Sequence, residues 1–142
     1  MAKCSAQVTH NHKEGIKGAQ IIAACIYLLR IGKNKDFIKE FVSRYYNINF
    51  RLNDIRDSYV FDVSCQGSVP QAVVAFLEGD SYESVIALAN SIGGDSDTIA
   101  AIAGSLAEVI YPIPEKILKI AEQTLDGYLK ETINDVVSVI EK

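Results

Sequence analysis

The sequence predicts an all-α protein, an orthogonal bundle of about seven helices. Apolar residues recur at helical spacing along most of the chain, as at Ile22, Cys25, Ile26 and Leu29. Residues 98–110 are apolar or glycine nearly all round, which is typical of a helix inside a core. The chain has 142 residues, 49% of them hydrophobic. A chain of about 150 residues buries roughly two-thirds of its unfolded surface, so this bundle can form a core without disulfide bonds or bound metals.

The N-terminal half contains two long predicted helices and one short one. The first covers about residues 13–31 and ends at Gly32, since glycine is common just past a helix C-terminus. The second covers about residues 34–46, with apolar residues along one stripe. A short helix is expected near residues 52–58, and residues 59–63 are expected to be extended or a loop.

The C-terminal half contains the remaining predicted helices. Ser68 and Gln71 have the spacing of a capping box, with Pro70 in the first turn, which predicts a helix from there to about residue 77. Glycines and prolines separate the helices that follow. These are expected at about residues 81–90, 98–110 and 114–125, with a last helix after Gly127.

Composition and charge exclude several classes of protein. The net charge of −4 argues against a nucleic-acid partner. The longest apolar run, residues 21–29, is too short to span a membrane, and the first residues lack the apolar segment of a signal peptide. The odd number and wide spacing of Cys4, Cys25 and Cys65 suit a reducing compartment. We therefore expect one cytoplasmic globular domain over residues 1–142.

The sequence Gly-Gly-Asp-Ser-Asp-Thr at residues 93–98 is the sharpest candidate site. Asp95 and Asp97, next to the Thr98 hydroxyl, offer hard oxygen ligands of the kind that Mg²⁺ or Ca²⁺ takes. The N–H groups at a helix start also favour a phosphate. Ordinary helix capping is the alternative, although capping needs only one such residue. An EF-hand is excluded, because the spacing of its twelve-residue loop is absent.

Two other segments could take part in chemistry. His10 and His12 could bind a metal, one of them could contact a ligand hydroxyl or phosphate, or both could form a polar helix entrance. No Cys-x-x-Cys spacing supports a zinc site. Cys65 could be a nucleophile if a histidine lay beside it, but a loop and helix start next to a site is the simpler interpretation. Cys25, on an apolar stripe, is expected in the core.

Three sequence blocks resemble the ADP-ribosylglycohydrolase family. Ser91–Gly104 is similar to the C-terminal signature of that family, and Val8–Ala19 and Ser64–Ala72 are similar to two earlier blocks, in the family's order. The family domain is longer than this chain. Its N-terminal half, with a Thr-Asp-Asp metal motif and an early acidic catalytic residue, has no counterpart here. The resemblance therefore implies the C-terminal half of an all-α ADP-ribosylglycohydrolase fold, as a single truncated domain.

The resemblance also implies an activity and a cofactor. Family members hydrolyse the glycosidic bond between ADP-ribose and an acceptor, such as arginine, serine or a small molecule, with two Mg²⁺ ions. Carried over to this sequence, Asp95, Asp97 and Thr98 are implied Mg²⁺ ligands, and the two carboxylates are also implied catalytic groups. The implied substrate-binding residues are His10, Gly94 and Ser96.

Two functions follow as alternatives. The chain is expected to be such a hydrolase, impaired on its own because Asp95 and Asp97 supply only part of the metal site. The other possibility is a non-catalytic ADP-ribose-binding module or a structural relic of the family. A domain cut through its core exposes an apolar face, so we expect a homo-oligomer, in the simplest case a two-fold dimer. The acceptor group is not determined by the sequence.

Overall fold

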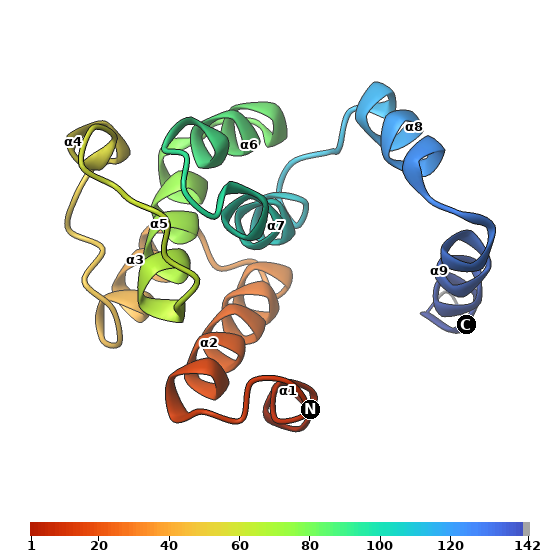
Figure 1. The fold of residues 1–142 in the computed structure, drawn as a ribbon, viewed down its shortest axis with the longest axis horizontal. Helices are drawn as coiled ribbons and strands as arrows, with labels where there is room; N and C mark the ends of the chain where they lie inside the picture. Colours follow the sequence, from red (N-terminus) through yellow and green to blue (C-terminus); the bar gives the residue numbers. More distant parts are fainter. Residues whose placement is uncertain (141–142) are drawn as a thin grey trace. The chain divides into compact units, whose positions relative to one another are not determined.

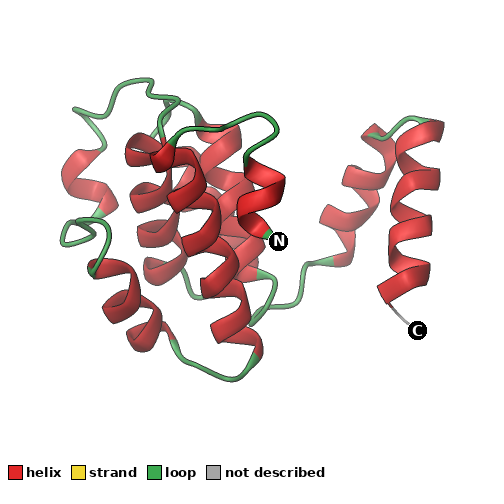
Figure 2. Ribbon diagram, turned by 90° about the horizontal axis from the view of Figure 1, so that it is seen from below, coloured by secondary structure: helices red, strands yellow, loops and turns green. Residues whose placement is uncertain are grey.

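The computed structural model describes residues 1–140 and divides the chain into two compact units, Met1–Pro112 (unit 1) and Ile113–Lys142 (unit 2). Every regular element within residues 1–140 is a helix (Figure 1, Figure 2), so the all-α prediction is confirmed. Unit 1 contains α1 (Ala2–Ala6), α2 (Lys13–Arg30), α3 (Lys35–Ser43), α4 (Leu52–Ile55), α5 (Cys65–Glu78), α6 (Tyr82–Ser91) and α7 (Ser96–Ala107). Unit 2 contains α8 (Glu115–Thr124) and α9 (Gly127–Ile140). The single domain over residues 1–142 stays a prediction, and residues 141–142 lie outside the described part.

The start of α5 differs from the prediction. The helix begins at Cys65 because the Ser64 side chain accepts a hydrogen bond from the Gly67 amide, at 3.1 Å. The predicted capping box at Ser68 is therefore wrong: Ser68 lies inside the helix, is buried, and donates its hydroxyl to the Asp62 carbonyl at 3.5 Å. Pro70 consequently lies in the body of the helix. A local sequence pattern does not show which of two serines four residues apart caps the helix, because tertiary contacts decide this.

Other helix boundaries differ by a few residues. α1 was not predicted, since it has no side-chain cap and buries no residue. α4 ends at Ile55, so residues 56–64 form a long loop, without the extended strand considered for residues 59–63. α7 begins two residues earlier and ends three residues earlier than residues 98–110. The end of α2 agrees with the prediction: Gly32 follows it with a φ of 84°, a conformation that glycine adopts without strain.

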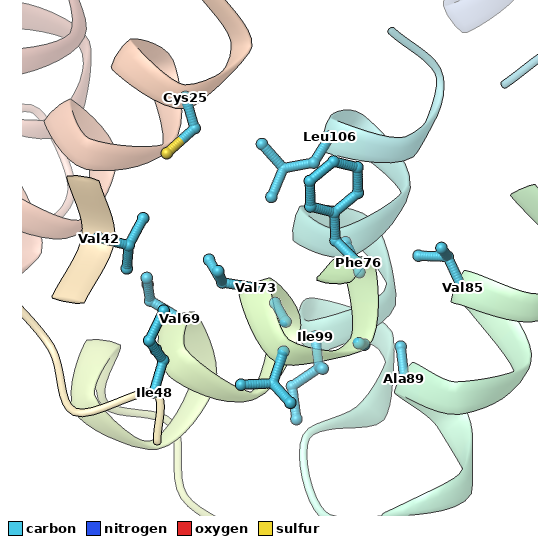
Figure 3. Packing of buried hydrophobic residues seen from close by; sticks show 14 of the residues in the cluster. Cys25, Val42, Ile48, Val69, Val73, Phe76, Val85, Ala89, Ile99 and Leu106 are labelled. Atoms are coloured by element: carbon cyan, nitrogen blue, oxygen red, sulfur yellow. The ribbon is translucent and has the colours of Figure 1, made fainter. Parts of the chain in front are cut away.

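The core of unit 1 is built around α5. Nine residues of this helix are buried, including all but one from Gly67 to Phe76. α5 packs against α2, α4, α6 and α7. Figure 3 shows Val73 and Phe76 of α5 among Leu106 of α7, Val85 of α6 and other buried side chains. A helix covered on so many sides is held rigidly, so its first turn offers a fixed point for the loops around it.

α7 packs closely against α5 and α6, as the apolar character of its sequence predicts. Ile99, Ala103 and Leu106 of this helix are completely buried. Gly104 faces α6, where an added Cβ would lie 3.0 Å from the Ile86 Cδ1 atom. This packing fixes the direction of α7 and therefore the position of the turn that precedes it.

Unit 2 has little buried surface of its own. α8 contains no buried residue, and Leu129, Ile133 and Val136 of α9 are exposed. The described helices of both units include none that is long and apolar enough to cross a membrane.

Replacing a core side chain of α5 tests this account of the fold. We expect Phe76→Ala to lower the free energy of unfolding by about 3–5 kcal/mol, because the completely buried ring leaves a cavity. The control is Phe37→Ala on α3, where the ring is 39% exposed. It is expected to change the free energy of unfolding by about 0.5 kcal/mol. Urea denaturation measures both, and equal losses would contradict the central place of α5.

Candidate functional site

Three segments meet around the first turn of α5. They are the loop of residues 56–64, the residues Cys65–Gly67 that begin α5, and the Gly93–Gly94 turn that leads into α7. Arg56 fixes one end of the loop, since its guanidinium donates to the Ser91 carbonyl at the end of α6, at 3.1 Å. The loop therefore bridges the segments that carry two of the three family-like sequence blocks.

Tyr59 makes the central contact of this bridge. Its hydroxyl donates to the Gly67 carbonyl in the first turn of α5, at 2.7 Å. Its ring lies against Gly94, so closely that a Cβ at Gly94 would collide with the ring. Burial raises the pKa of the Tyr59 hydroxyl, and the nearby charges of Asp62 and Asp95 raise it further. Tyr59 therefore stays protonated and able to donate at neutral pH.

Asp62 belongs to the same loop and faces α5. Its carboxylate accepts a hydrogen bond from the Ser64 amide at 2.8 Å. This bond lowers the pKa of Asp62, with a further contribution from the Ser64 side chain. The carboxylate lies against Gly67, where an added Cβ would collide with it. Asp62 is therefore ionised at neutral pH beside the start of α5.

The Gly93–Gly94 turn presents the two predicted metal-binding carboxylates. Both glycines have positive φ, 70° and 66°. Asp95 then occupies the N-cap position of α7, but its side chain makes no capping hydrogen bond. Asp97 accepts a hydrogen bond from the Thr98 amide at 2.9 Å. That bond, together with hydrogen bonding to the Asp95 side chain, lowers the pKa of Asp97, so the two carboxyl groups lie next to each other.

This donor set fits a hard cation such as Mg²⁺ only in part. Two adjacent carboxylates and the Thr98 hydroxyl are oxygen ligands, and Mg²⁺ keeps several waters when few protein ligands are available. The residues from 1 to 140 include no cluster of three or more His, Cys, Asp or Glu side chains that could hold a metal. Metal binding by Asp95, Asp97 and Thr98 stays a prediction.

The two histidines have different surroundings. His12 is the N-cap of α2, where its Nδ1 accepts from the Glu14 amide at 3.3 Å, so it has a local structural role. His10 is exposed and shares a hydrogen bond with the Thr9 hydroxyl, at 2.7 Å. It lines a hollow of about 380 Å³ whose opposite wall includes Ser64 and Gln66. His12 lines the same hollow, so both histidines border it together with the start of α5.

Gln66 borders this hollow and also a second one. The second hollow has a volume of about 360 Å³ and is lined by Tyr59, Asp62 and Gln71 as well. The Gln71 amide oxygen is buried without a hydrogen-bond partner. Sequence analysis did not single out Tyr59, Asp62 or Gln66 as site residues. The only available signal was their position just before and within the Ser64–Ala72 block.

The predicted site residues are thus divided between two places. Gly94, Asp95, Ser96, Asp97 and Thr98 are consecutive at the start of α7, whereas His10 lines a hollow that it shares with the start of α5. Tyr59 contacts both helix starts and so connects them. The substrate-binding roles of His10, Gly94 and Ser96 stay predictions.

Cys65 does not have the character of a nucleophile. Burial raises the pKa of its thiol, and the Glu14 carboxylate adds to this effect. At neutral pH the group is therefore a thiol and not the reactive thiolate. Cys25 is completely buried, as predicted, and burial raises the pKa of its thiol to about 12.

An all-α fold that presents a Gly-Gly-Asp-Ser-Asp-Thr turn at a helix start agrees with the result of comparison with known families. The sequence model of the ADP-ribosylglycohydrolase family matches residues 1–142, the whole chain. The chain belongs to this family, which is a family of glycoside hydrolases. Comparison with curated proteins and with solved structures gave no match.

Alanine substitutions at the two glycines of the turn test its packing. Both require a side chain at positive φ, which costs about 1–2 kcal/mol. An added Cβ at Gly93 meets nothing within 4 Å, whereas one at Gly94 collides with the Tyr59 ring. We therefore expect Gly94→Ala to lower the free energy of unfolding in urea more than Gly93→Ala. Equal losses would show that Tyr59 does not pack against this turn.

Proposed function

We propose that this chain is an ADP-ribosyl hydrolase that binds Mg²⁺ through Asp95, Asp97 and Thr98. The observation that carries the proposal is the pair of adjacent carboxyl groups at the turn before α7. The Asp95 side chain makes no capping hydrogen bond and lies beside the Asp97 carboxylate. Membership of a glycoside hydrolase family supplies the reaction type.

The chemistry of the site residues suits cleavage of a bond to ribose. Departure of the acceptor builds positive charge on the sugar ring, and a carboxylate such as Asp97 stabilises that charge. Mg²⁺, when bound, lowers the pKa of a coordinated water and orients it. A helix N-terminus favours an anion, so the start of α7 is the proposed contact for the diphosphate of ADP-ribose. His10, Gly94 and Ser96 contact the substrate in this proposal.

The same site predicts weak activity for this chain alone. Two carboxylates and one hydroxyl leave most coordination positions of Mg²⁺ to water, so its affinity is low. The two-ion arrangement expected for the family needs more carboxylate ligands than the cluster at α7 provides. The second candidate function, a module that binds ADP-ribose without cleaving it, is favoured by this shortage of ligands.

We further propose that two copies of the chain associate through an apolar hollow of unit 1. This hollow has a volume of about 480 Å³ and is lined by Ile22 and Ile26 of α2, Val69 of α5 and Ile102 of α7, among others. Apolar surface of this kind is commonly covered by a partner. A cytoplasmic location is part of the same proposal, because Cys4, Cys25 and Cys65 are all free.

Removing the paired carboxylates tests the proposed function. We expect Mg²⁺-dependent release of free ADP-ribose from an ADP-ribosylated substrate, slower than about 1 s⁻¹. The double variant Asp95→Asn, Asp97→Asn is expected to abolish it. Asp36→Asn is the matched control, since Asp36 and Asp97 each occupy the second position of a helix and are exposed.

The outcomes separate the two candidate functions. Binding of ADP-ribose without any release would favour the non-catalytic module. Full activity of the double variant would contradict the assignment of Asp95 and Asp97.

Sedimentation velocity tests the proposed association. We expect the natural chain to sediment as a dimer and Ile102→Asp to sediment as a monomer. Dimerisation would bury the new carboxylate in the apolar hollow, and burying an unpaired charge is costly. Ile31→Asp is the control, since Ile31 is 54% exposed and lies outside the hollow. A natural chain that stays monomeric at high concentration would contradict the proposal.

A further inference from the structure

The loop of residues 56–64 is fastened at several points to the segments that carry the candidate site. Arg56 donates to the Ser91 carbonyl, two residues before Gly93, at 3.1 Å. The Ser68 hydroxyl, inside α5, donates to the Asp62 carbonyl at 3.5 Å. Between these two fixed points, Tyr59 contacts both α5 and the turn before α7.

The contact between Tyr59 and Gly94 fixes where the turn lies. Gly94 has no side chain, so the ring packs directly on its backbone. Gly93, the neighbouring residue, has no atom of another segment within 4 Å of its Cβ position. The Tyr59 ring therefore packs on the turn at Gly94 and not at Gly93, whose amide donates to the Asn90 carbonyl at 3.2 Å.

The hydroxyl of Tyr59 fixes the ring in turn. Its hydrogen bond to Gly67 joins the ring to α5, the most buried helix of unit 1. Gly67 itself is buried. Besides the packing of α7 itself, Tyr59 thus links the turn to α5, with one polar contact at Gly67 and one packing contact at Gly94.

We infer that Tyr59 is a positioning residue for the carboxylates of Asp95 and Asp97. The inference rests on the proposed function, in which these two side chains bind Mg²⁺. A turn with two glycines at positive φ is costly to order, and each ordered residue costs conformational entropy. Tyr59 holds the turn in its binding arrangement before the cation arrives, which removes part of that cost from binding. This saving in ordering cost matters most for a cation with few protein ligands, because each ligand then contributes a large share of the binding free energy.

The sharpest test compares two tyrosines that each donate to a glycine carbonyl of the α5 region. Tyr59 donates to Gly67 at the start of α5, and Tyr111 donates to Gly79 just after its end, at 3.4 Å. Tyr59→Phe and Tyr111→Phe each remove one hydroxyl and keep the ring. Calorimetric titration with MgCl₂ gives the dissociation constant of each variant, and thermal unfolding reports any general loss of stability.

We expect Tyr59→Phe to raise the dissociation constant for Mg²⁺ about three- to tenfold, the effect of one hydrogen bond. Tyr111→Phe is expected to stay within about twofold of the natural chain, since its hydroxyl lies at the other end of α5. Equal dissociation constants for the two variants would overturn the inference. A purely structural role would lower the unfolding temperature without separating these constants.

Hydrogen exchange without metal distinguishes failure of this inference from failure of the proposed function. If the natural chain binds no Mg²⁺, the proposed function fails. The hydrogen-exchange rates of the amides of residues 94–98, measured without metal, then test the role of Tyr59. Faster exchange at these amides in Tyr59→Phe than in Tyr111→Phe would support positioning of the turn. Equal exchange rates at these amides in the two variants would overturn the inference.

Discussion

The burial of α5 is the constraint on which the rest of unit 1 depends. Its residues from Gly67 to Phe76 are almost all buried, and it packs against four other helices. Apolar burial of this extent supplies most of the free energy that holds such a unit together. It also leaves the first turn of α5 with little freedom to move. The loops that contact that turn are therefore built on a rigid base.

The candidate site extends this rigidity outward through a few polar contacts. The Ser64 cap sets where α5 begins. The Tyr59 hydroxyl donates to the Gly67 carbonyl and the Ser68 hydroxyl donates to the Asp62 carbonyl, and these two bonds attach the preceding loop to the first turn of α5. Glycine occurs where a side chain of the loop lies directly on the backbone, the Asp62 carboxylate on Gly67 and the Tyr59 ring on Gly94. The result is a surface where rigid neighbours surround a turn whose carboxylates remain exposed or half-buried. This combination suits a site that binds a charged ligand.

The sequence predicted the features that depend on local pattern. The helical spacing of apolar residues predicted the all-α fold, and the apolar character around Ile99 and Ala103 predicted that this helix packs into the core. The resemblance of three blocks predicted the family, which the family comparison confirmed. Gly32 marked the end of a helix as expected, because that requirement for positive φ is local.

Features that depend on contacts distant in sequence were not predicted. The ring of Tyr59 contacts Gly94, 35 residues away, and no local pattern signals that contact. The start of α5 was placed at Ser68 because the sequence alone does not show that Ser68 is buried against the Asp62 carbonyl. The helix cap at His12, by contrast, is a local contact and agrees with the polar helix entrance considered for the two histidines. A site assembled from loops and helix starts is thus the part of a helical protein that is hardest to predict from its sequence.

We propose that the turn before α7, the loop of residues 56–64 and the first turn of α5 form one metal-responsive site. Amide chemical-shift mapping during titration of the full chain with MgCl₂ tests it most directly. We expect chemical-shift changes at the amides of Gly94 to Thr98, smaller changes at Tyr59 and Gly67, and none in α3, which includes Asp36. Shifts spread evenly over exposed acidic residues, or no shift at Asp97 and Thr98, would contradict it.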